Sequence, residues 1–392
     1  MAIPRRTASV ALSTLLAVAV AGCGATAQGS RKVRVTDDSD YLAVAQARVD
    51  NDYRGTNRKP DPTPRPATRG KKVAILSLGQ ISISSRTPSN AALEAAQALG
   101  WQAAVLDSQL DPRRAPVLMQ QALNSGVDGI IVDAIDCPLI APQLLQAKQK
   151  GIPVIPIYAF DCNDGLFGGL GKPLFSSYVN YGPDAKDIGT FTLDYGADQA
   201  DAVIAHTGGH ARVIFFNDPL LSVLQYTARG FKDELAKCDD CKLVAEVDFH
   251  SNELGPQLYA KAAAALKNHP EANAVKIPYT SAALGGIIDA VMKSGRSDDL
   301  FVVGGEGFEP ELNLIRTRQG LDAVNIISSE WVGWAAVDSL NSKFLGKEPV
   351  DSGIGWTLAD LNHNVPPTGP YVPAVDFRAA YREVWGIGPG TG

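Results

Sequence analysis

Two stretches that directly follow predicted strands, 133–137 and 158–162, contain carboxyl, tyrosine and cysteine side chains that could do chemistry. Two short runs rich in β-branched residues, 129–132 and 152–157, flank a stretch, 138–150, with apolar residues at helical spacing. This order of strand, helix and strand makes the two strands parallel, and ligands bind beyond the carboxyl ends of such strands in open sheets. Residues 133–137 and 158–162 are therefore the first candidates for a binding site.

The elements that must position these residues alternate regularly from Lys72 onward. Helical stretches separate the expected strands, which lie at 73–78, 102–108, 129–132, 152–157, 211–216, 243–249, 274–277 and 300–304. One doubly wound sheet of this many strands would be large, so the sequence predicts two similar α/β lobes. Residues 24–70 are polar and end in a proline-rich stretch, which is typical of an extended spacer, with a short helix possible at 41–49.

Composition limits the classes of partner. The chain has 392 residues, of which 45% are hydrophobic and 20% charged, enough to bury two substantial cores. Its net charge of −6 gives no support for nucleic-acid binding, which normally requires a basic face. A neutral or locally charged solute is the easier partner.

The first residues have the features of an export signal. Arg5 and Arg6 precede an apolar run, 10–20, that is too short to span a bilayer comfortably. Val-Ala-Gly then precedes Cys23, and this resembles the lipobox of bacterial lipoproteins. The resemblance implies a signal peptide at 1–22 and a lipid on Cys23 that holds the protein at the outer face of the cytoplasmic membrane. The alternative is a secretory signal with a chance cysteine at its end.

Four further cysteines are expected to form disulfides, because an even number in an oxidising compartment favours bridges over zinc or a catalytic thiol. Cys238 and Cys241 lie in one polar turn, where a local bridge fits. Cys137 and Cys162 both follow strands that the crossover unit places side by side, so we expect them to pair and to stiffen the rim of the cleft.

Seven motifs follow one another along the chain: LGWQAAVLDSQLDP, SGVDGIIVDAID, QKGIPVIPIY, the RGF triplet at 229–231, VDF at 247–249, ALGG at 283–286 and VVGGEG at 302–307. In this order and spacing the chain resembles the type 1 periplasmic binding proteins, in particular the ribose-like sugar-binding branch of bacterial ABC importers, over about residues 71–345. The resemblance implies two doubly wound lobes joined by three hinge crossings, with ligand closing the cleft between them. It assigns 71–180 plus 328–350 to the N-terminal lobe and 181–327 plus 351–392 to the C-terminal lobe, after a tether at 23–70.

The resemblance also assigns candidate ligand contacts: Gln80, Ser82, Ser84, Ser85, Tyr158, Tyr226, Thr227, Phe249, Tyr279, Glu306 and Trp331. Some positions differ from the sugar-binding pattern, since serines stand where that branch stacks aromatic rings and Thr227 stands in place of a ligand-gripping arginine. Phe249 and Glu306 match a family aromatic and an acidic residue. Glu306 with neighbouring tyrosines can accept hydrogen bonds from polyol hydroxyls or pair with a cationic amine.

These features predict a lipid-anchored, extracytoplasmic, monomeric protein that delivers a sugar or polyol to an ABC permease, without a cofactor or metal. Alternatives are a solute-sensing receptor for a membrane kinase, a binder of an amine or aromatic solute, and a hydrolase using Asp136 and Glu306 as paired carboxylates. A transcriptional regulator lacks support, because no helix-turn-helix precedes Lys71. Phe249 and Tyr279 could also be strand-end packing, and Trp331 core packing.

Overall fold

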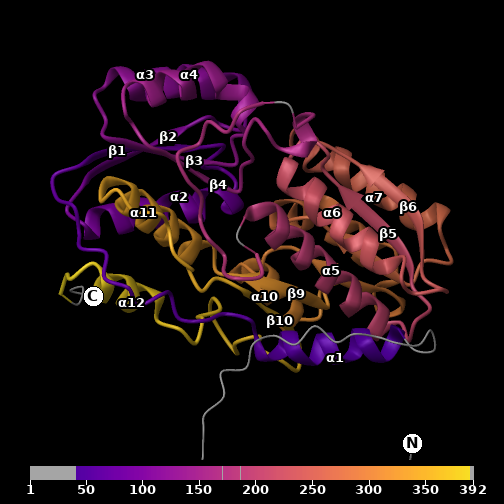
Figure 1. Cartoon of the computed structure of the whole chain (residues 1–392). Helices are drawn as coiled ribbons and strands as arrows, with labels where there is room; N and C mark the ends of the chain where they lie inside the picture. The colour runs from indigo at the N-terminus through magenta and orange to yellow at the C-terminus, as the bar shows by residue number, and fades with distance from the viewer. Residues whose placement is uncertain (1–40, 170, 186, 389–392) are drawn as a thin grey trace, which may run out of the picture. The chain divides into compact units, whose positions relative to one another are not determined.

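The computed structural model describes residues 41–169, 171–185 and 187–388. The predicted signal peptide and Cys23 lie outside these residues. Two parallel sheets with helices on both faces form two lobes, as the sequence predicted (Figure 1).

The sheet of the first lobe has four parallel strands in the order β2-β1-β3-β4. Its strands are β1 (Lys72–Ser77), β2 (Gln102–Asp107), β3 (Gly129–Asp133) and β4 (Val154–Ile157). One face packs against α2 (Ile83–Ala98) and α11 (Ser329–Phe344), and the other against α3 (Ala115–Asn124) and α4 (Cys137–Gln149). Because both faces are covered, β3 is buried along its whole length, which explains its unbroken apolar run.

The sheet of the second lobe has six strands in the order β10-β9-β8-β7-β5-β6, and only β10 runs antiparallel. Its strands are β5 (Arg212–Asn217), β6 (Lys242–Asp248), β7 (Ala274–Ile277), β8 (Phe301–Gly304), β9 (Ala323–Ile327) and β10 (Trp356–Asp360). Its helices are α5 (Ile188–His206), α6 (Ser222–Leu235), α7 (Pro256–Asn268), α8 (Thr280–Ala282), α9 (Ile288–Lys293) and α10 (Glu309–Arg316). Helices α5 and α6 pack backbone to backbone, since a Cβ at Gly230 would lie 2.0 Å from the carbonyl oxygen of Leu193. This contact accounts for the glycine of the RGF triplet.

The segment expected to be a spacer is part of the fold from Tyr41 onward. Helix α1 (Tyr41–Arg54) lies along α5 and β10 (Figure 1), and its Arg48 pairs with the buried carboxylate of Asp201 at 3.1 Å. Further along, the amide nitrogens of Thr56 and Arg58 donate to the carbonyl oxygens of Trp356 and Gly353. The tether prediction is therefore wrong for residues 41–69, because their polar side chains have buried partners that the local composition does not show.

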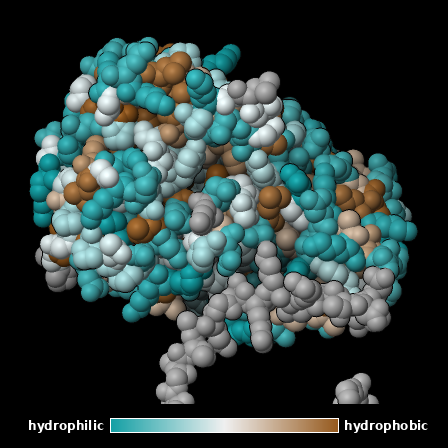
Figure 2. Space-filling view, in the orientation of Figure 1, coloured by the Kyte–Doolittle hydropathy of each residue, from teal (hydrophilic) through white to brown (hydrophobic). Residues whose placement is uncertain are grey.

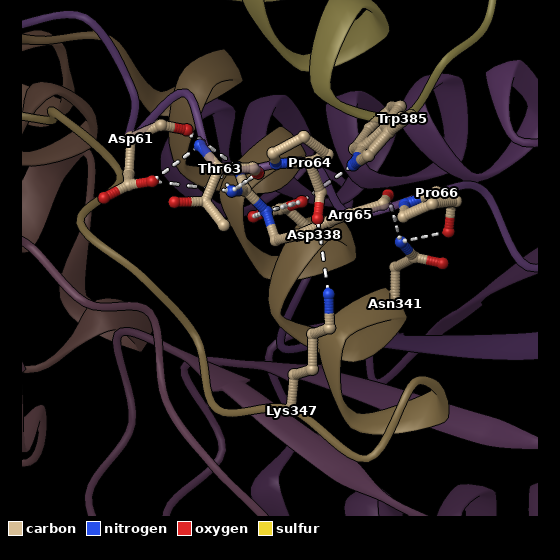
Figure 3. Close-up of polar contacts among 9 residues, drawn as sticks. All are labelled: Asp61, Thr63, Pro64, Arg65, Pro66, Asp338, Asn341, Lys347 and Trp385. Atoms are coloured by element: carbon tan, nitrogen blue, oxygen red, sulfur yellow. Dashed lines mark hydrogen bonds and ion pairs between the residues drawn. The ribbon is translucent and has the colours of Figure 1, made fainter.

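Arg65 is the centre of this attachment (Figure 3). Its side chain is 1% exposed, and Nε lies 2.9 Å from both carboxylate oxygens of Asp338 on α11. Trp385 donates from Nε1 to the same carboxylate at 2.7 Å. The main chain of Arg65 also donates to the carbonyl oxygen of Val384. We call residues 56–69 the strap.

The C-terminal helix α12 (Phe377–Val384) also packs where the sequence did not place it. The Phe377 ring stacks on Trp331, and Trp385 stacks on Trp334 at 5.3 Å between ring centroids. Both contacts belong to the core of the first lobe, so α12 does not belong to the C-terminal lobe as expected. A stripe of aromatic residues on α11 determines this docking.

Five segments connect the lobes: the strap between α1 and β1, the chain between β4 and α5, Ser328 between β9 and α11, the return from α11 to β10, and the chain from β10 to α12. The chain between β4 and α5 lies beside the return from α11 to β10, where Ser352 donates its amide to the carbonyl oxygen of Asn180. Among the described residues, no helix is long and apolar enough to cross a membrane. The face shown in Figure 2 is mainly hydrophilic, with separate hydrophobic patches.

Candidate functional site

A pocket of about 130 Å³ lies between the carboxyl ends of the two sheets. Loops that follow β1 to β4 form one wall, and loops that follow β5 to β9, together with residues of α5 and α6, form the opposite wall. The volume far exceeds the ~10–15 Å³ that one buried water requires, so it can hold a small organic molecule. Much of the lining is apolar: Leu78, Leu110, Ala134, Leu221, Val223, Leu224, Leu254, Pro278 and Ile327.

Glu306 is the acidic group on the wall of the second lobe. The hydroxyl of Ser84 on α2 donates to its Oε2, and the amide of Thr280 lies 3.2 Å from the same oxygen. Burial raises the pKa of the Glu306 carboxyl. Since Ser84 and Glu306 belong to different lobes, this hydrogen bond holds the cleft closed in the structure.

The loop that presents Glu306 has a conformation that requires glycine. Gly305 has φ of 90°, and a Cβ there would lie 1.8 Å from the Glu311 carboxylate. That carboxylate accepts hydrogen bonds from the amides of Glu306 and Gly307 at 3.1 and 2.7 Å. Burial and the nearby charge of Glu306 raise the pKa of Glu311 to about 7.

Asp133 is the acidic group on the opposite wall, at the end of β3. It is fully buried, Ser89 donates to its Oδ2 at 3.2 Å, and its Oδ1 has no partner. Burial and, to a lesser extent, the charge of Glu306 raise the pKa of Asp133 to about 8. No arginine, lysine or histidine is found among the described residues that line the pocket. An anionic ligand would therefore meet two carboxyl groups without a counter-charge.

Comparison with known proteins agrees with this architecture. A model for the periplasmic binding protein domain matches residues 85–348. This chain belongs to the periplasmic binding protein family. Members of the family bind solutes for transport and are not enzymes.

A curated relative is the xylitol-binding protein of Mycolicibacterium smegmatis, 25% identical over 201 residues. The match covers 50% of this chain, and the chain spans half the length of that relative.

Solved structures share the fold. GanP, a glucose-galactose binding protein from Geobacillus stearothermophilus, is 20% identical with a TM-score of 0.63, over 75% of this chain and 99% of its own. A solute-binding protein from Agrobacterium vitis with bound allitol is 18% identical with a TM-score of 0.62, over 74% and 96%. One from Mycobacterium smegmatis with bound glycerol is 19% identical with a TM-score of 0.60, over 78% and 100%.

The structure brings most of the predicted contacts of this periplasmic binding protein together. The candidates that line the pocket are Ser82, Ser84, Ser85, Tyr158, Thr227, Tyr279 and Glu306. The polar lining residues that the sequence analysis did not select are Thr192, Tyr195, Ser251, Ser281 and Ser329, while Asp133 belongs to the stretch 133–137 that it named as a first candidate. The sequence indicated Asp133, because this residue directly follows a predicted strand. No sequence pattern indicated that Thr192 and Tyr195 line the pocket, because they lie inside α5.

Four candidates lie outside the pocket lining. Gln80 donates from Nε2 to the hydroxyl of Ser77, at the end of β1, at 2.8 Å. Phe249 and Trp331 are fully buried, the latter stacked on Phe377, which makes both core residues. The fourth, Tyr226, contacts the other lobe outside the pocket. None of these four side chains lines the pocket, where the sequence predicted direct ligand contact.

Asp136 does not support the hydrolase alternative. It lies outside the pocket lining, its Oδ1 accepts from the amide of Phe160, and its Oδ2 accepts from the hydroxyl of Ser222. Both carboxylate oxygens are thus engaged in structural bonds.

Both expected disulfides are confirmed. Cys137 bonds to Cys162, and Cys238 to Cys241. The first pair joins the start of α4 to the chain after β4, close to the cleft. The carboxylate of Asp161 lies close enough to both sulfur atoms for the three residues to bind a metal ion. However, the disulfide engages both sulfur atoms, and the carboxylate of Asp161 accepts hydrogen bonds from backbone amides.

Proposed function

We propose that this chain is the extracytoplasmic solute-binding component of an ABC importer, and that it binds a small uncharged polyol or sugar in the pocket between its lobes. The observation that carries the proposal is the lining: the buried carboxyl group of Asp133, the half-buried carboxyl group of Glu306 and several hydroxyl side chains, with no cation among the described lining residues. Carboxyl groups accept hydrogen bonds from ligand hydroxyls, while the apolar lining packs against the carbon chain.

Relatives support the same ligand class. The curated relative is named for xylitol, and a structural neighbour contains allitol. Both are linear polyols, whose hydroxyl groups match the acceptors in this pocket. Serines in place of aromatic rings after β1 also favour a flexible, hydroxyl-rich molecule over a stacked pyranose ring.

Binding acts through closure of the lobes. A ligand that contacts Asp133 on one wall and Glu306 on the other gains both sets of contacts only when the cleft is closed. It therefore shifts the equilibrium toward the closed state. A permease that distinguishes the closed from the open protein would therefore engage loaded protein in preference to free protein.

The membrane anchor belongs to the same proposal. The lipobox at Cys23 supports a lipid that holds the protein at the outer face of the cytoplasmic membrane, near its permease. We propose that the protein acts there as a monomer. The alternative is a receptor that presents the same solute to a membrane sensor kinase. Permease genes next to the gene for this protein would favour import over sensing.

Thermal shift tests the ligand class. The chain from residue 24 is melted with polyols, sugars, amines and aromatic acids, because a ligand of the folded state alone raises the melting temperature. We expect hits among linear polyols or pentoses, lost in Glu306→Ala. Hits confined to amines would favour a cation paired with the two carboxyl groups and would overturn the polyol assignment.

A further inference from the structure

A second group of contacts joins the lobes outside the ligand pocket. Ser222 and Tyr226 lie one helical turn apart on α6, so their side chains share one face of the helix. The hydroxyl of Ser222 donates to Asp136 at 2.7 Å. The Tyr226 hydroxyl lies 2.8 and 2.9 Å from the two carboxylate oxygens of Asp164. Both acceptors belong to the first lobe.

An aromatic contact accompanies these hydrogen bonds. The ring of Tyr226 stacks on that of Phe160, with centroids 4.8 Å apart and planes inclined by 14°. Phe160 is 3% exposed and is held to the first lobe by an amide hydrogen bond to Asp136. One face of α6 therefore makes two hydrogen bonds to carboxylates and one stacking contact across the cleft.

The disulfide Cys137–Cys162 ties the acceptor side together. Cys137 directly follows Asp136, and Cys162 lies between Phe160 and Asp164. The amide of Cys137 also donates to the carbonyl oxygen of Phe160. The bridge thus holds at fixed spacing the two segments that receive Ser222 and Tyr226. The Cys238–Cys241 bridge lies within the second lobe, after α6, and touches none of these residues.

We propose that these residues form a disulfide-braced latch, Asp136, Phe160 and Asp164 against Ser222 and Tyr226, which stabilises the closed state without touching the ligand. The inference rests on the proposed function, because it assumes that closure accompanies solute binding. In an open cleft the two sides separate and every latch contact breaks. The latch therefore increases the affinity for every ligand by the same factor, whereas the pocket determines which ligand is preferred.

Binding to xylitol and L-arabinose tests the latch. Tyr226→Phe and Ser222→Ala should each raise the Kd by about threefold to tenfold, the effect expected from one hydrogen bond, mainly through faster dissociation. The factor should be equal for both ligands. Tyr53→Phe is the matched control, since its hydroxyl also bonds a carboxylate, that of Asp360, but within the second lobe. Its Kd should not change.

The role of the Cys137–Cys162 disulfide is tested by comparing variants that lack each of the two disulfides. Cys137→Ser/Cys162→Ser should weaken binding in the same way as the latch variants, and Cys238→Ser/Cys241→Ser should not. Unchanged affinity in Tyr226→Phe and Ser222→Ala would overturn the proposal. A change in the preference between the two ligands would also overturn it, because that result assigns these residues to the pocket.

A ligand-free measurement separates the latch from the proposed function. If neither compound binds the parent protein, the proposed ligand class fails, and small-angle X-ray scattering still tests the latch. A larger radius of gyration in Tyr226→Phe/Ser222→Ala than in Tyr53→Phe would support a latch that holds the free protein closed. Equal radii would refute it.

Discussion

Arg65→Met should destabilise the protein although the residue lies far from the pocket in a segment that the sequence assigns to a spacer. Arg65 and Asp338 form a buried pair, with side chains 1% and 6% exposed. Removing one partner of such a pair typically costs about 3–5 kcal/mol, because the remaining charge stays buried. With an unfolding entropy of about 2.1 cal/mol/K per residue, a loss of about 4 kcal/mol lowers the melting temperature of a fold this size by about 5 °C.

Calorimetry of the variant beside Arg58→Met checks this expectation. Arg58 lies in the same strap and pairs with Asp351, but its side chain is 46% exposed. An exposed pair contributes about 0–1 kcal/mol, so that control should melt within about 1 °C of the parent.

The pH dependence gives a second readout. Burial already raises the pKa of Asp338, and Arg65 opposes that shift. Without the arginine the pKa of Asp338 rises further, so the carboxyl group takes up a proton in the folded state. The stability lost in Arg65→Met should therefore be smaller at pH 5 than at pH 8. Arg65→Met/Asp338→Asn should recover stability at pH 8. Equal melting of Arg65→Met and Arg58→Met would refute the reasoning, since it would mean that the buried pair contributes no more to stability than the exposed one.

Three further outcomes are expected. The pKa of Asp133 is about 8 in the folded protein and near 4 in the unfolded chain, so protonated Asp133 contributes stability that is fully present below pH 4 and is lost as the pH rises through 8. The melting temperature of Asp133→Asn should therefore depend less on pH between pH 6 and 9 than that of the parent protein. Phe249→Ala should cost about 3–5 kcal/mol in chemical denaturation, yet leave the order of ligand preference unchanged, because this ring is a core residue. Cys23→Ser should release the protein from the membrane fraction into the soluble fraction of fractionated cells, and retention of the variant would contradict the lipid anchor.

The pocket shows how far sequence reasoning reaches. Tyr158, Tyr279 and Glu306 all follow strands, so a correct strand assignment placed them at one edge of each sheet. Phe249 also follows a strand, but its ring packs in the hydrophobic core of the second lobe, which its position after a strand does not reveal. Tyr226 was selected as a ligand contact from the resemblance, and it lies in the cleft but contacts the opposite lobe.

The sequence by itself determined the two α/β lobes, both disulfides and most polar residues of the pocket. The lobes and the disulfides depend on local patterns, namely the period of apolar residues and the spacing of cysteines, whereas most of the pocket residues were assigned by the family resemblance. The tertiary structure alone decided the positions of the strap and α12. Arg65 is charged and lies among prolines, so its local context indicates solvent exposure, and only the distant Asp338 makes its burial favourable. The closed cleft likewise depends on pairs far apart in sequence, such as Ser84 with Glu306, which no local pattern encodes.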